Sequence, residues 1–461
     1  MLRKEDNELI TQTGPGTPCG ELMRRYWQPA ALAEELPVGG APLPIRLLSE
    51  DLVLFRDDQG RPGLLGLHCS HRGADLSYGR LEDGGLRCIY HGWLYDINGR
   101  CLEQPGEPAG QAGPATERGN ASDGPLLAAG PARFADKIRH PAYPCVERAG
   151  AIFAYLGPGE PPEFPNYEFL LPRPPESMDV IKRYHECNYH QSNEGNIDTS
   201  HLSFLHYLNM PYGGGPANPG TTLNHRGARP GLETMEVDRT PYGVRGCRVQ
   251  GGWGTDKVFS VTEFILPNLG AFSNNSLIVG EDAGEEAHPG YTVNWHVPID
   301  DTHHWKYVFN FSSRGPLEGA RGRDQTEMVD YRPVRNLSNR FRQDREEMVS
   351  RTYIGMGADF QLHDKWVTEG QGPIQDRTTE HLGALDTPVV MCRGILLKAI
   401  RDLQEGREPS NVVRDPKLNR LPIIPLRAIV PLSTDWDWKQ FRYGDQSPDP
   451  AGVEAGTAGT R

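Results

Sequence analysis

The chain lacks any long hydrophobic run. Among its 461 residues there is no stretch of about eighteen consecutive apolar residues, the length that would predict a membrane-spanning helix. The first residues, 1–8, contain no apolar core of the kind that a secretion signal requires. We therefore expect no membrane partner and a cytoplasmic location.

Basic charge is also scarce. The 48 Lys and Arg residues are outnumbered by 61 Asp and Glu residues, which gives a formal net charge of −13. This balance argues against nucleic acid as a partner. No Gly-x-Gly-x-x-Gly motif follows a predicted strand, so we expect no dinucleotide-binding unit. The eight Cys residues are too scattered for a disulfide scaffold, and they suit a reducing compartment.

Two short segments each combine one Cys with one His. Cys69-x-His71 is followed by Cys88-x-x-His91, and each pair lies on a predicted turn. Zinc sites usually pair like residues, as Cys-x-x-Cys and His-x-x-x-His. A mixed pair in each of two loops suits a Rieske [2Fe–2S] centre, in which two thiolates hold one iron and two imidazoles hold the other. Zinc remains the alternative.

A second group of possible metal ligands lies in residues 194–206, which include His201 and His206. Two His and a carboxylate form the facial triad of non-haem Fe(II) oxygenases, which leaves positions open for O2 and substrate. Residues five apart on a regular helix point about 140° apart. The two imidazoles therefore converge only if the helix widens or ends here. The alternative is a helix whose two His residues lie in the core or on the surface and bind no metal. The cluster motif earlier in the chain argues against this alternative.

The chain divides near residue 165, after a Pro/Gly-rich segment. We predict a helical N-terminal segment (1–44) packed on the second domain, a β domain (45–164) with an irregular insertion (104–133), a mixed domain (165–446) and a disordered tail (447–461). Hairpin signals flank residues 57–60, and a buried strand is expected at 151–156. In the second domain we expect strands at 234–237, 244–249, 291–297 and 305–311, and a helix at 388–405.

These motifs resemble the α subunit of Rieske non-haem iron aromatic-ring oxygenases, most of all the phthalate dioxygenase branch. The similarity covers nearly the whole chain and includes the opening segment 19–29, both metal motifs and the segment 372–382. It implies an α+β fold: an antiparallel β Rieske domain beside a catalytic domain whose antiparallel sheet is covered by helices. The insertion at 104–133 is longer than the family pattern.

The resemblance also assigns metal ligands. The cluster would be held by Cys69, His71, Cys88 and His91, and the mononuclear iron by His201, His206 and a carboxylate far downstream. Asp364 matches that carboxylate, and Asp376 is its competitor. Since Asp376 precedes Arg377, and Asp–Arg pairs are more often structural, we favour Asp364.

Asp198 has a different expected role. In the family a carboxylate at this position bridges neighbouring subunits of a trimer, where it accepts hydrogen bonds from the rings of His201 and, across the interface, His91. Such a carboxylate orients a metal-bound imidazole and raises its basicity. The alternative is a carboxylate favoured by the dipole at a helix start. Glu194, one turn earlier, is either a neighbour of the metal ligands or a solvated side chain.

The resemblance implies a terminal oxygenase that uses O2 and electrons to hydroxylate an aromatic substrate, with an aromatic carboxylate as our expectation. The electrons would come from NAD(P)H through a separate flavin and iron–sulfur reductase. Arg226, Arg229 and Arg245 are candidates to bind the carboxylate by bidentate hydrogen bonds, although surface Arg residues are usually just solvated.

Two other functions stay open. The same ligands serve monooxygenation, including oxidative O-demethylation of an aryl ether. A Rieske electron-transfer protein or redox sensor would need only the cluster. By resemblance, the expected assembly is a homotrimer without small subunits.

Overall fold

The computed structural model describes residues 1–106, 134–206, 233–253, 256–273, 277–278, 290–312, 315–317, 326–421 and 423–441. Arg226, Arg229, the tail 447–461 and most of the expected insertion at 104–133 lie outside these residues. None of the described helices combines the length and the hydrophobicity that crossing a membrane requires.

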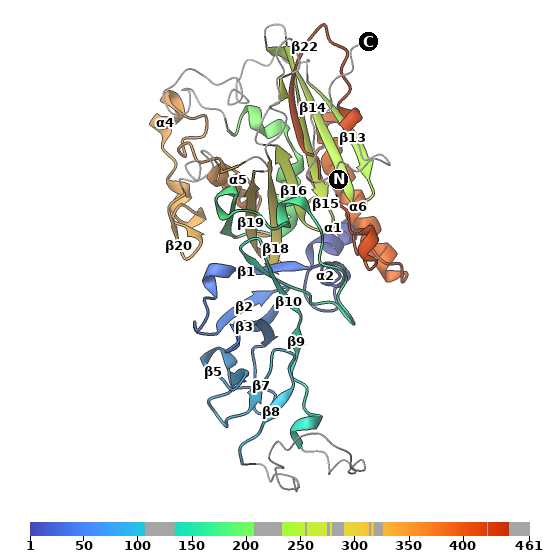
Figure 1. Ribbon diagram of the computed structural model, residues 1–461. Coiled ribbons are helices and arrows are strands. Elements are labelled where there is room, and N and C mark those ends of the chain that lie inside the picture. The colour runs from blue at the N-terminus through green and yellow to red at the C-terminus, as the bar shows by residue number, and fades with distance from the viewer. Residues whose placement is uncertain are drawn as a thin grey trace.

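Three small antiparallel sheets form the first domain (Figure 1). One contains β1 (Gln28–Leu32), β11 (Ala151–Ala154) and β10 (Cys145–Arg148). The second contains β2 (Leu43–Leu47), β3 (Glu50–Arg56), β4 (Pro62–Gly66) and β9 (Ala142–Tyr143). The third contains β5 (Arg80–Glu82), β6 (Gly85–Arg87), β7 (Leu94–Tyr95) and β8 (Cys101–Glu103).

The predicted hairpin around residues 57–60 is confirmed as β3 and β4. The Asp57 carboxylate closes its turn by accepting the backbone N–H groups of Gln59 at 3.0 Å and Arg61 at 2.8 Å. Alternate residues of a strand face opposite sides. Leu54 accordingly packs in the main core of the chain, whereas Phe55 packs in a separate core around the Cys69 and Cys88 loops. The hairpin therefore joins the two cores.

The second domain is built on a nine-stranded sheet. Its main order is β12 (Met178–His185), β19 (His303–Phe311), β18 (Tyr291–Asp300), β16 (Leu269–Ser273), β15 (Asp256–Ile265), β14 (Gly243–Trp253) and β13 (Glu233–Thr240), all antiparallel. β22 (Leu426–Pro431) pairs with β15, and β17 (Leu277–Ile278) pairs with β22. The four predicted strands of this domain are confirmed as β13, β14, β18 and β19.

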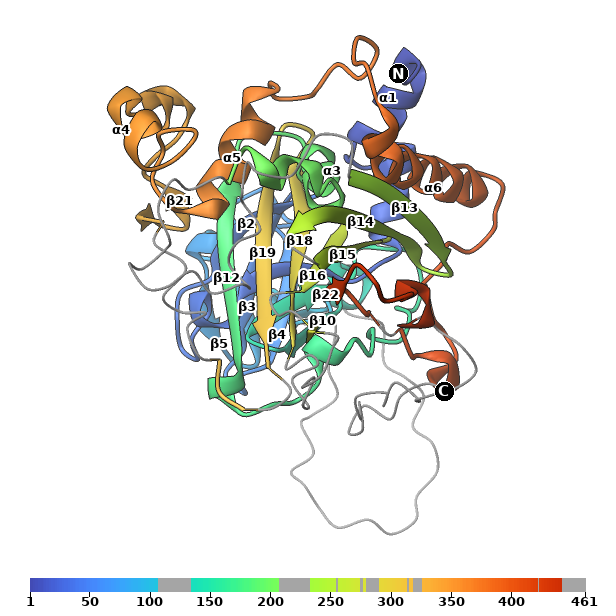
Figure 2. The same cartoon turned by 90° about the horizontal axis from the view of Figure 1, so that it is seen from above.

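Helices lie along one side of this sheet, and two of them pack on it, so the α+β fold class is confirmed (Figure 2). The helices are α1 (Lys4–Thr11), α2 (Pro18–Arg24), α3 (Tyr189–Ile197), α4 (Arg345–Ser350), α5 (Phe360–Gly370) and α6 (Thr387–Gln404), and a short hairpin is formed by β20 (Met328–Val329) and β21 (Arg332–Pro333). α3 packs on β15, β16 and β18, and α6 packs on β13 and β14. The predicted helix at 388–405 is thus α6, and apolar residues along it, among them Val389, Cys392 and Leu396, are buried.

The N-terminal segment 1–44 is helical only as far as Arg24, so that expectation is partly wrong. Residues Gln28–Leu32 form strand β1, which pairs with the edge of Ala151–Ala154 in the first domain. All five residues of β1 are buried, and this short apolar run supplies the strand partner that β11 needs. α1 and α2 pack against α6 of the second domain.

Candidate metal centres

The two loops that carry the Cys–His pairs are built alike. The backbone N–H of Gly73 donates to the carbonyl of Cys69 at 2.8 Å, and that of Gly92 donates to the carbonyl of Cys88 at 2.9 Å. The two glycines have φ values of +73° and +76°, a conformation that glycine adopts without steric cost. Cys69 and Cys88 therefore occupy the same position in two matching turns.

Each loop buries its thiol and exposes its imidazole. Cys69 and Cys88 are each 3% exposed, whereas His71 and His91 are exposed with ring centroids 4.4 Å apart. Burial, together with the adjacent Cys69 thiol, raises the pKa of Cys88. The Tyr95 hydroxyl lies 3.2 Å from the Cys69 sulfur. Two inner thiols and two outer imidazoles fit the asymmetric donor set of a [2Fe–2S] cluster.

The zinc alternative requires four ligand atoms around one ion. Among the described residues, the one group of three or more possible ligands whose atoms all lie within 4.8 Å of one another is His201, His206 and Asp364. The Cys and His residues of the two loops do not converge in this way. Their arrangement favours a two-iron cluster over a single zinc ion.

The second site forms where α3 ends. The helix stops at Ile197, Asp198 is its C-cap, and a 3-10 turn (Ser200–Ser203) follows. This is the helix end that the five-residue spacing required. It brings the rings of His201 and His206 to a centroid distance of 5.2 Å, so the two imidazoles converge.

Asp364 on α5 completes the group. Its Oδ1 atom lies 3.0 Å from Nε2 of His206 and 3.7 Å from Nε2 of His201. The competitor Asp376 is exposed, and its Oδ1 atom accepts the backbone N–H of Thr378 at 2.9 Å. The donor set of His201, His206 and Asp364 fits a facial triad for Fe(II).

We had expected Asp376 to pair with Arg377, but it does not. The Arg377 guanidinium instead forms a bidentate ion pair with Glu194, whose Oε2 lies 2.8 Å from Nη2. Both side chains are buried, at 0% and 8% exposed. Glu194 is therefore not a solvated side chain.

A third imidazole, His363, stacks beside His206, with ring centroids 5.4 Å apart. Nε2 of His363 donates to the carbonyl of Gly357 at 2.9 Å. Nδ1 of His363 lies 3.2 Å from Nδ1 of His206, and Nε2 of His206 faces Asp364. Burial lowers the pKa of His363 to about 4 and also lowers the pKa of His206, which keeps both rings neutral near pH 7. Sequence reasoning missed His363, although it adjoins Asp364.

Asp364 and Asp198 are both ionised. Burial acts to raise the pKa of Asp364, but the adjacent His206 outweighs it and holds the pKa well below its usual range. For Asp198, burial is outweighed by the hydrogen bond with His201, and the pKa is lowered. The same hydrogen bond overcomes burial at His201 and raises its pKa. Both carboxylates can therefore hold a metal or orient an imidazole.

Asp198 lies on the outer side of His201. Its Oδ2 atom is 3.5 Å from Nδ1 of His201, and its Oδ1 accepts the backbone N–H of Ser200 at 2.7 Å. Arg248 steadies the same turn by donating to the carbonyl of Thr199 at 2.8 Å. The Asp198 side chain remains 29% exposed, so it contacts His201 while still facing outward.

A cavity of about 160 Å³ lies beside the His–His–Asp group. Its lining includes His201 and Asp364 together with the buried polar side chains of Lys306 and His296 and the partly buried Asn196. Several of its lining side chains therefore offer charged or hydrogen-bonding groups to a polar part of a substrate.

Arg245 is absent from the described lining of this cavity. It lies on β14, buried, with Nε 3.4 Å from the Glu263 carboxylate and its guanidinium 5.1 Å from the ring centre of Trp438. The expectation that Arg245 binds the substrate is not supported. Arg245 and Glu263 are cross-strand neighbours, which explains the ion pair.

The fold and the two sites together define a class: a two-domain redox protein with a Rieske centre and a second site suited to non-haem iron. Family comparisons agree. Residues 26–115 match the Rieske [2Fe-2S] domain, and residues 154–457 match the family described as LigXa C-terminal domain like.

Curated relatives extend this match over the whole chain. The oxygenase subunit of phthalate 4,5-dioxygenase from Pseudomonas putida is 34% identical, over 96% of this chain and 96% of the relative. The oxygenase subunit of 5,5'-dehydrodivanillate O-demethylase from a Sphingobium species is 30% identical, over 93% and 87%. The oxygenase subunit of tert-butanol monooxygenase / tert-amyl alcohol desaturase from Aquincola tertiaricarbonis is 34% identical, over 88% and 78%. The chain belongs to the Rieske non-haem iron oxygenases, as an oxygenase subunit of the phthalate dioxygenase branch.

Solved structures share the fold. The reduced oxygenase–ferredoxin complex of carbazole 1,9a-dioxygenase has a TM-score of 0.50 at 18% identity and covers 90% of this chain and 96% of that chain. NdmA of Pseudomonas putida CBB5, in a mutant form with theobromine, has a TM-score of 0.50 at 20% identity and covers 86% and 95%. At these identities the likeness concerns the fold alone.

Proposed function

We propose that this chain is the terminal oxygenase component that hydroxylates an aromatic substrate with O2 and reductase-supplied electrons. The observation that carries the proposal is the convergence of His201, His206 and Asp364 in a chain that also has the two Cys–His loops. An electron-transfer protein or redox sensor would need only the loops and would not need a second site beside a cavity.

In this proposal Cys69, His71, Cys88 and His91 hold the [2Fe–2S] cluster, and His201, His206 and Asp364 hold Fe(II). When bound, the cluster supplies electrons one at a time and the iron supplies open positions for O2 chemistry. The chain contributes orientation. His363 contacts the His206 ring at Nδ1, which leaves Nε2 directed toward Asp364, and Asp198 contacts the His201 ring at Nδ1.

Asp198 is the proposed bridge for electrons between subunits. The sheet β5–β8, next to the cluster loops, lies at one end of the molecule, whereas the helices lie across the large sheet (Figure 1). This separation supports a route between neighbouring chains of a homotrimer. His91 of the partner subunit, exposed in each chain, would meet the outward-facing Asp198 carboxylate.

An aromatic carboxylate is the substrate class that we favour. The names of the phthalate and 3-chlorobenzoate dioxygenase relatives support it. So does Lys306, a buried cation on β19 that lines the cavity beside Asp364. Monooxygenation, including O-demethylation of an aryl ether, is the second candidate, because the dehydrodivanillate relative is named for that reaction.

The electron source in this proposal is NAD(P)H, used by a separate flavin and iron–sulfur reductase. The carbazole oxygenase structures solved with a ferredoxin support an external redox partner. A cytoplasmic location suits eight Cys residues that are all free.

Metal and sulfide analysis combined with a substrate screen tests the proposal. An oxygenase should hold three iron atoms and two sulfides per chain, and should couple O2 uptake to product formation when a surrogate reductase is present. Two iron atoms per chain without substrate-dependent O2 uptake would instead indicate an electron carrier. Zinc without iron–sulfur absorption would refute the cluster assignment.

A further inference from the structure

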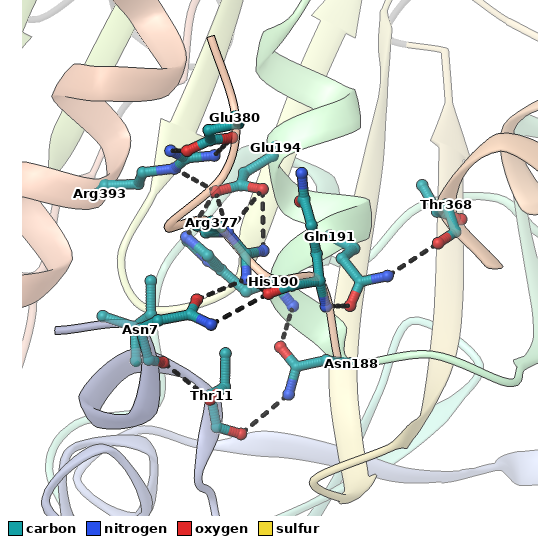
Figure 3. Close-up of polar contacts among 12 residues, drawn as sticks. Asn7, Thr11, Asn188, His190, Gln191, Glu194, Thr368, Arg377, Glu380 and Arg393 are labelled. Carbon is teal, nitrogen blue, oxygen red and sulfur yellow. Dashed lines mark hydrogen bonds and ion pairs between the residues drawn. The ribbon is translucent and has the colours of Figure 1, made fainter. Parts of the chain in front are cut away.

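A buried group of charged side chains surrounds Glu194 on α3 (Figure 3). Arg377 holds its carboxylate with three contacts of 2.8 to 3.1 Å. Arg393 of α6 also donates to it and forms a second ion pair with Glu380. Nε2 of His190 lies 3.3 Å from the same carboxylate. Two guanidinium groups and two carboxylates balance one another, so this group is electrically neutral in a buried place.

The group joins four separate parts of the chain. Glu194 belongs to α3, Arg393 to α6, and Arg377 and Glu380 to the segment that follows α5. The fourth part is α1, because Nη1 of Arg377 also donates to Oδ1 of Asn7 at 3.1 Å. Arg377 is fully buried, and its planar guanidinium serves both partners at once.

Glu194 is also the last hydrogen-bond acceptor of α3. Its backbone carbonyl accepts the N–H of Asp198 at 2.9 Å, and Asp198 is the C-cap from which the turn to His201 begins. Arg377 therefore holds the last turn of α3, from which the chain continues to Asp198 and His201. A shift of this turn would move the Asp198 carboxylate relative to the His201 ring.

A second set of contacts ties α3 to α5, the helix that carries Asp364. Nε2 of Gln191 donates to the carbonyls of Thr368 at 2.8 Å and Gly372 at 2.9 Å. The hydroxyl of Thr368 in turn donates to the carbonyl of Asp364 at 2.8 Å. Helix α3, which leads into the turn with His201, is thus fixed to α5, which carries Asp364, beside the Arg377 group and not only where the metal would bind.

We propose that Arg377 is a positioning residue for the hydroxylation reaction. It holds the last turn of α3 through Glu194, links that turn to α1 through Asn7, and so sets the geometry of Asp198 and His201. The proposal rests on the proposed oxygenase function. It assigns α1 a part in the active site, although α1 touches neither of the two metal centres.

Arg377→Lys tests the proposal while keeping the charge. A lysine ammonium cannot reproduce the bidentate pair with Glu194 and the bond to Asn7 together. We expect kcat per bound iron and cluster reoxidation to fall about tenfold or more, since small misplacements of reacting groups have effects of this size. KM and the cluster potential should stay near wild type, and the electron paramagnetic resonance spectrum of the mononuclear ferric iron should change.

Asn7→Ala is the milder companion variant, and it also decides the matter if Arg377→Lys does not fold. Its matched control is Asp6→Asn, the adjacent residue of α1. The Asp6 carboxylate pairs with Arg401 of α6 on the surface and does not reach α3. Asn7→Ala should lower kcat per iron and alter the iron spectrum, whereas Asp6→Asn should change neither.

The positioning role would be overturned if Asn7→Ala kept the wild-type kcat per iron and iron spectrum and showed only a lower melting temperature. Equal loss in Asp6→Asn would overturn it too, since α1 would then act only through general stability. A wild-type protein that lacks the third iron, or does not turn over, would contradict the proposed function itself. The wild-type and variant arms therefore separate the two failures.

Discussion

The two metal regions of this chain are built in opposite ways. The proposed cluster ligands come from two short loops with the same backbone hydrogen bonds, closed by Gly73 and Gly92. The proposed iron ligands come from distant parts of the chain, since His206 contacts His363, the residue before Asp364, which is 157 residues away in sequence. One region is specified locally, and the other depends on how α3 and α5 pack.

Their exposure differs in the same sense. Both imidazoles of the cluster loops lie on the surface, where an external partner can reach them. At the iron site the His206 side chain is only 5% exposed, while His201 and Asp198 keep 21% and 29%. Two imidazoles of the cluster loops are thus open to the surface, whereas the proposed iron site is largely enclosed and has an outward edge at Asp198.

The largest expected effect tests whether the two regions are independent. His201→Ala should abolish hydroxylation, by at least about a thousandfold, because it removes one of three iron ligands. The visible absorption of the cluster should stay unchanged, because the cluster has separate ligands. His303→Ala is the control, since His303 contacts Asp300 away from both sites. Loss of the cluster spectrum in His201→Ala would show that the regions are not independent.

The second effect concerns the cluster alone. His71→Cys should lower its midpoint potential by about 100 mV or more, because a thiolate donates more charge than a neutral imidazole. Iron at the second site should remain bound. A spectroelectrochemical titration measures the shift, and an unchanged potential would remove His71 from the ligand set.

The contrast between these regions explains what the sequence could predict. The cluster ligands and the β3–β4 hairpin are local, so spacing and turn residues identify them. The sequence predicted that His201 and His206 could converge only if the helix widened or ended between them. It could not predict the actual positions of the two rings. Asp364 was matched by resemblance and preferred to Asp376 because an Asp376–Arg377 pair was expected; Arg377 instead pairs with Glu194, but Asp364 does lie beside both imidazoles.

The remaining features depend on tertiary contacts that no local pattern encodes. The partner of Glu194 is Arg377, 183 residues away, and the role of His363 depends on the carbonyl of Gly357. Arg245 was expected to bind substrate because Arg suits carboxylates. Arg245 instead pairs with Glu263 on the neighbouring strand. That partner could have been predicted only if the pairing of β14 with β15 had been known.

The third effect is the pH dependence of the free energy of unfolding, to which a buried His of the second domain should contribute. Burial lowers the pKa of His304 to about 3, so the folded chain keeps it neutral. The unfolded chain has a His pKa of about 6.5, and it therefore binds more protons below that pH. The stability contributed at higher pH is lost as pH falls through about 6.5, with a slope approaching about 1.4 kcal/mol per pH unit.

His304→Asn isolates this contribution. The free energy of unfolding, measured with denaturant at pH 7.5 and 5.5, should depend less on pH in the variant than in the wild type. Equal pH dependence in His304→Asn and wild type would contradict a buried neutral His304.

The smallest effect compares the two cluster loops with each other. Gly73→Ala and Gly92→Ala should each destabilise the loop by about 1 kcal/mol, because both positions have positive φ. Gly92→Ala should cost more, since its Cβ would lie 3.0 Å from Cγ of Pro105, whereas Gly73 faces open space. Gly370→Ala, at an open position without positive φ, is the control in thermal unfolding. Equal costs at both loops would show that Pro105 moves aside.

Single-turnover reoxidation of the cluster in Asp198→Asn tests the central claim most directly. Asp198 is proposed as a bridge and not as a ligand, so the variant should bind iron at both sites and its cluster should be reduced normally by dithionite. When the reduced variant meets substrate and O2, cluster reoxidation should be slower than in the wild type by orders of magnitude, because a neutral amide orients the two imidazoles less firmly. Reoxidation at the wild-type rate would contradict the account and leave Asp198 as a helix cap only.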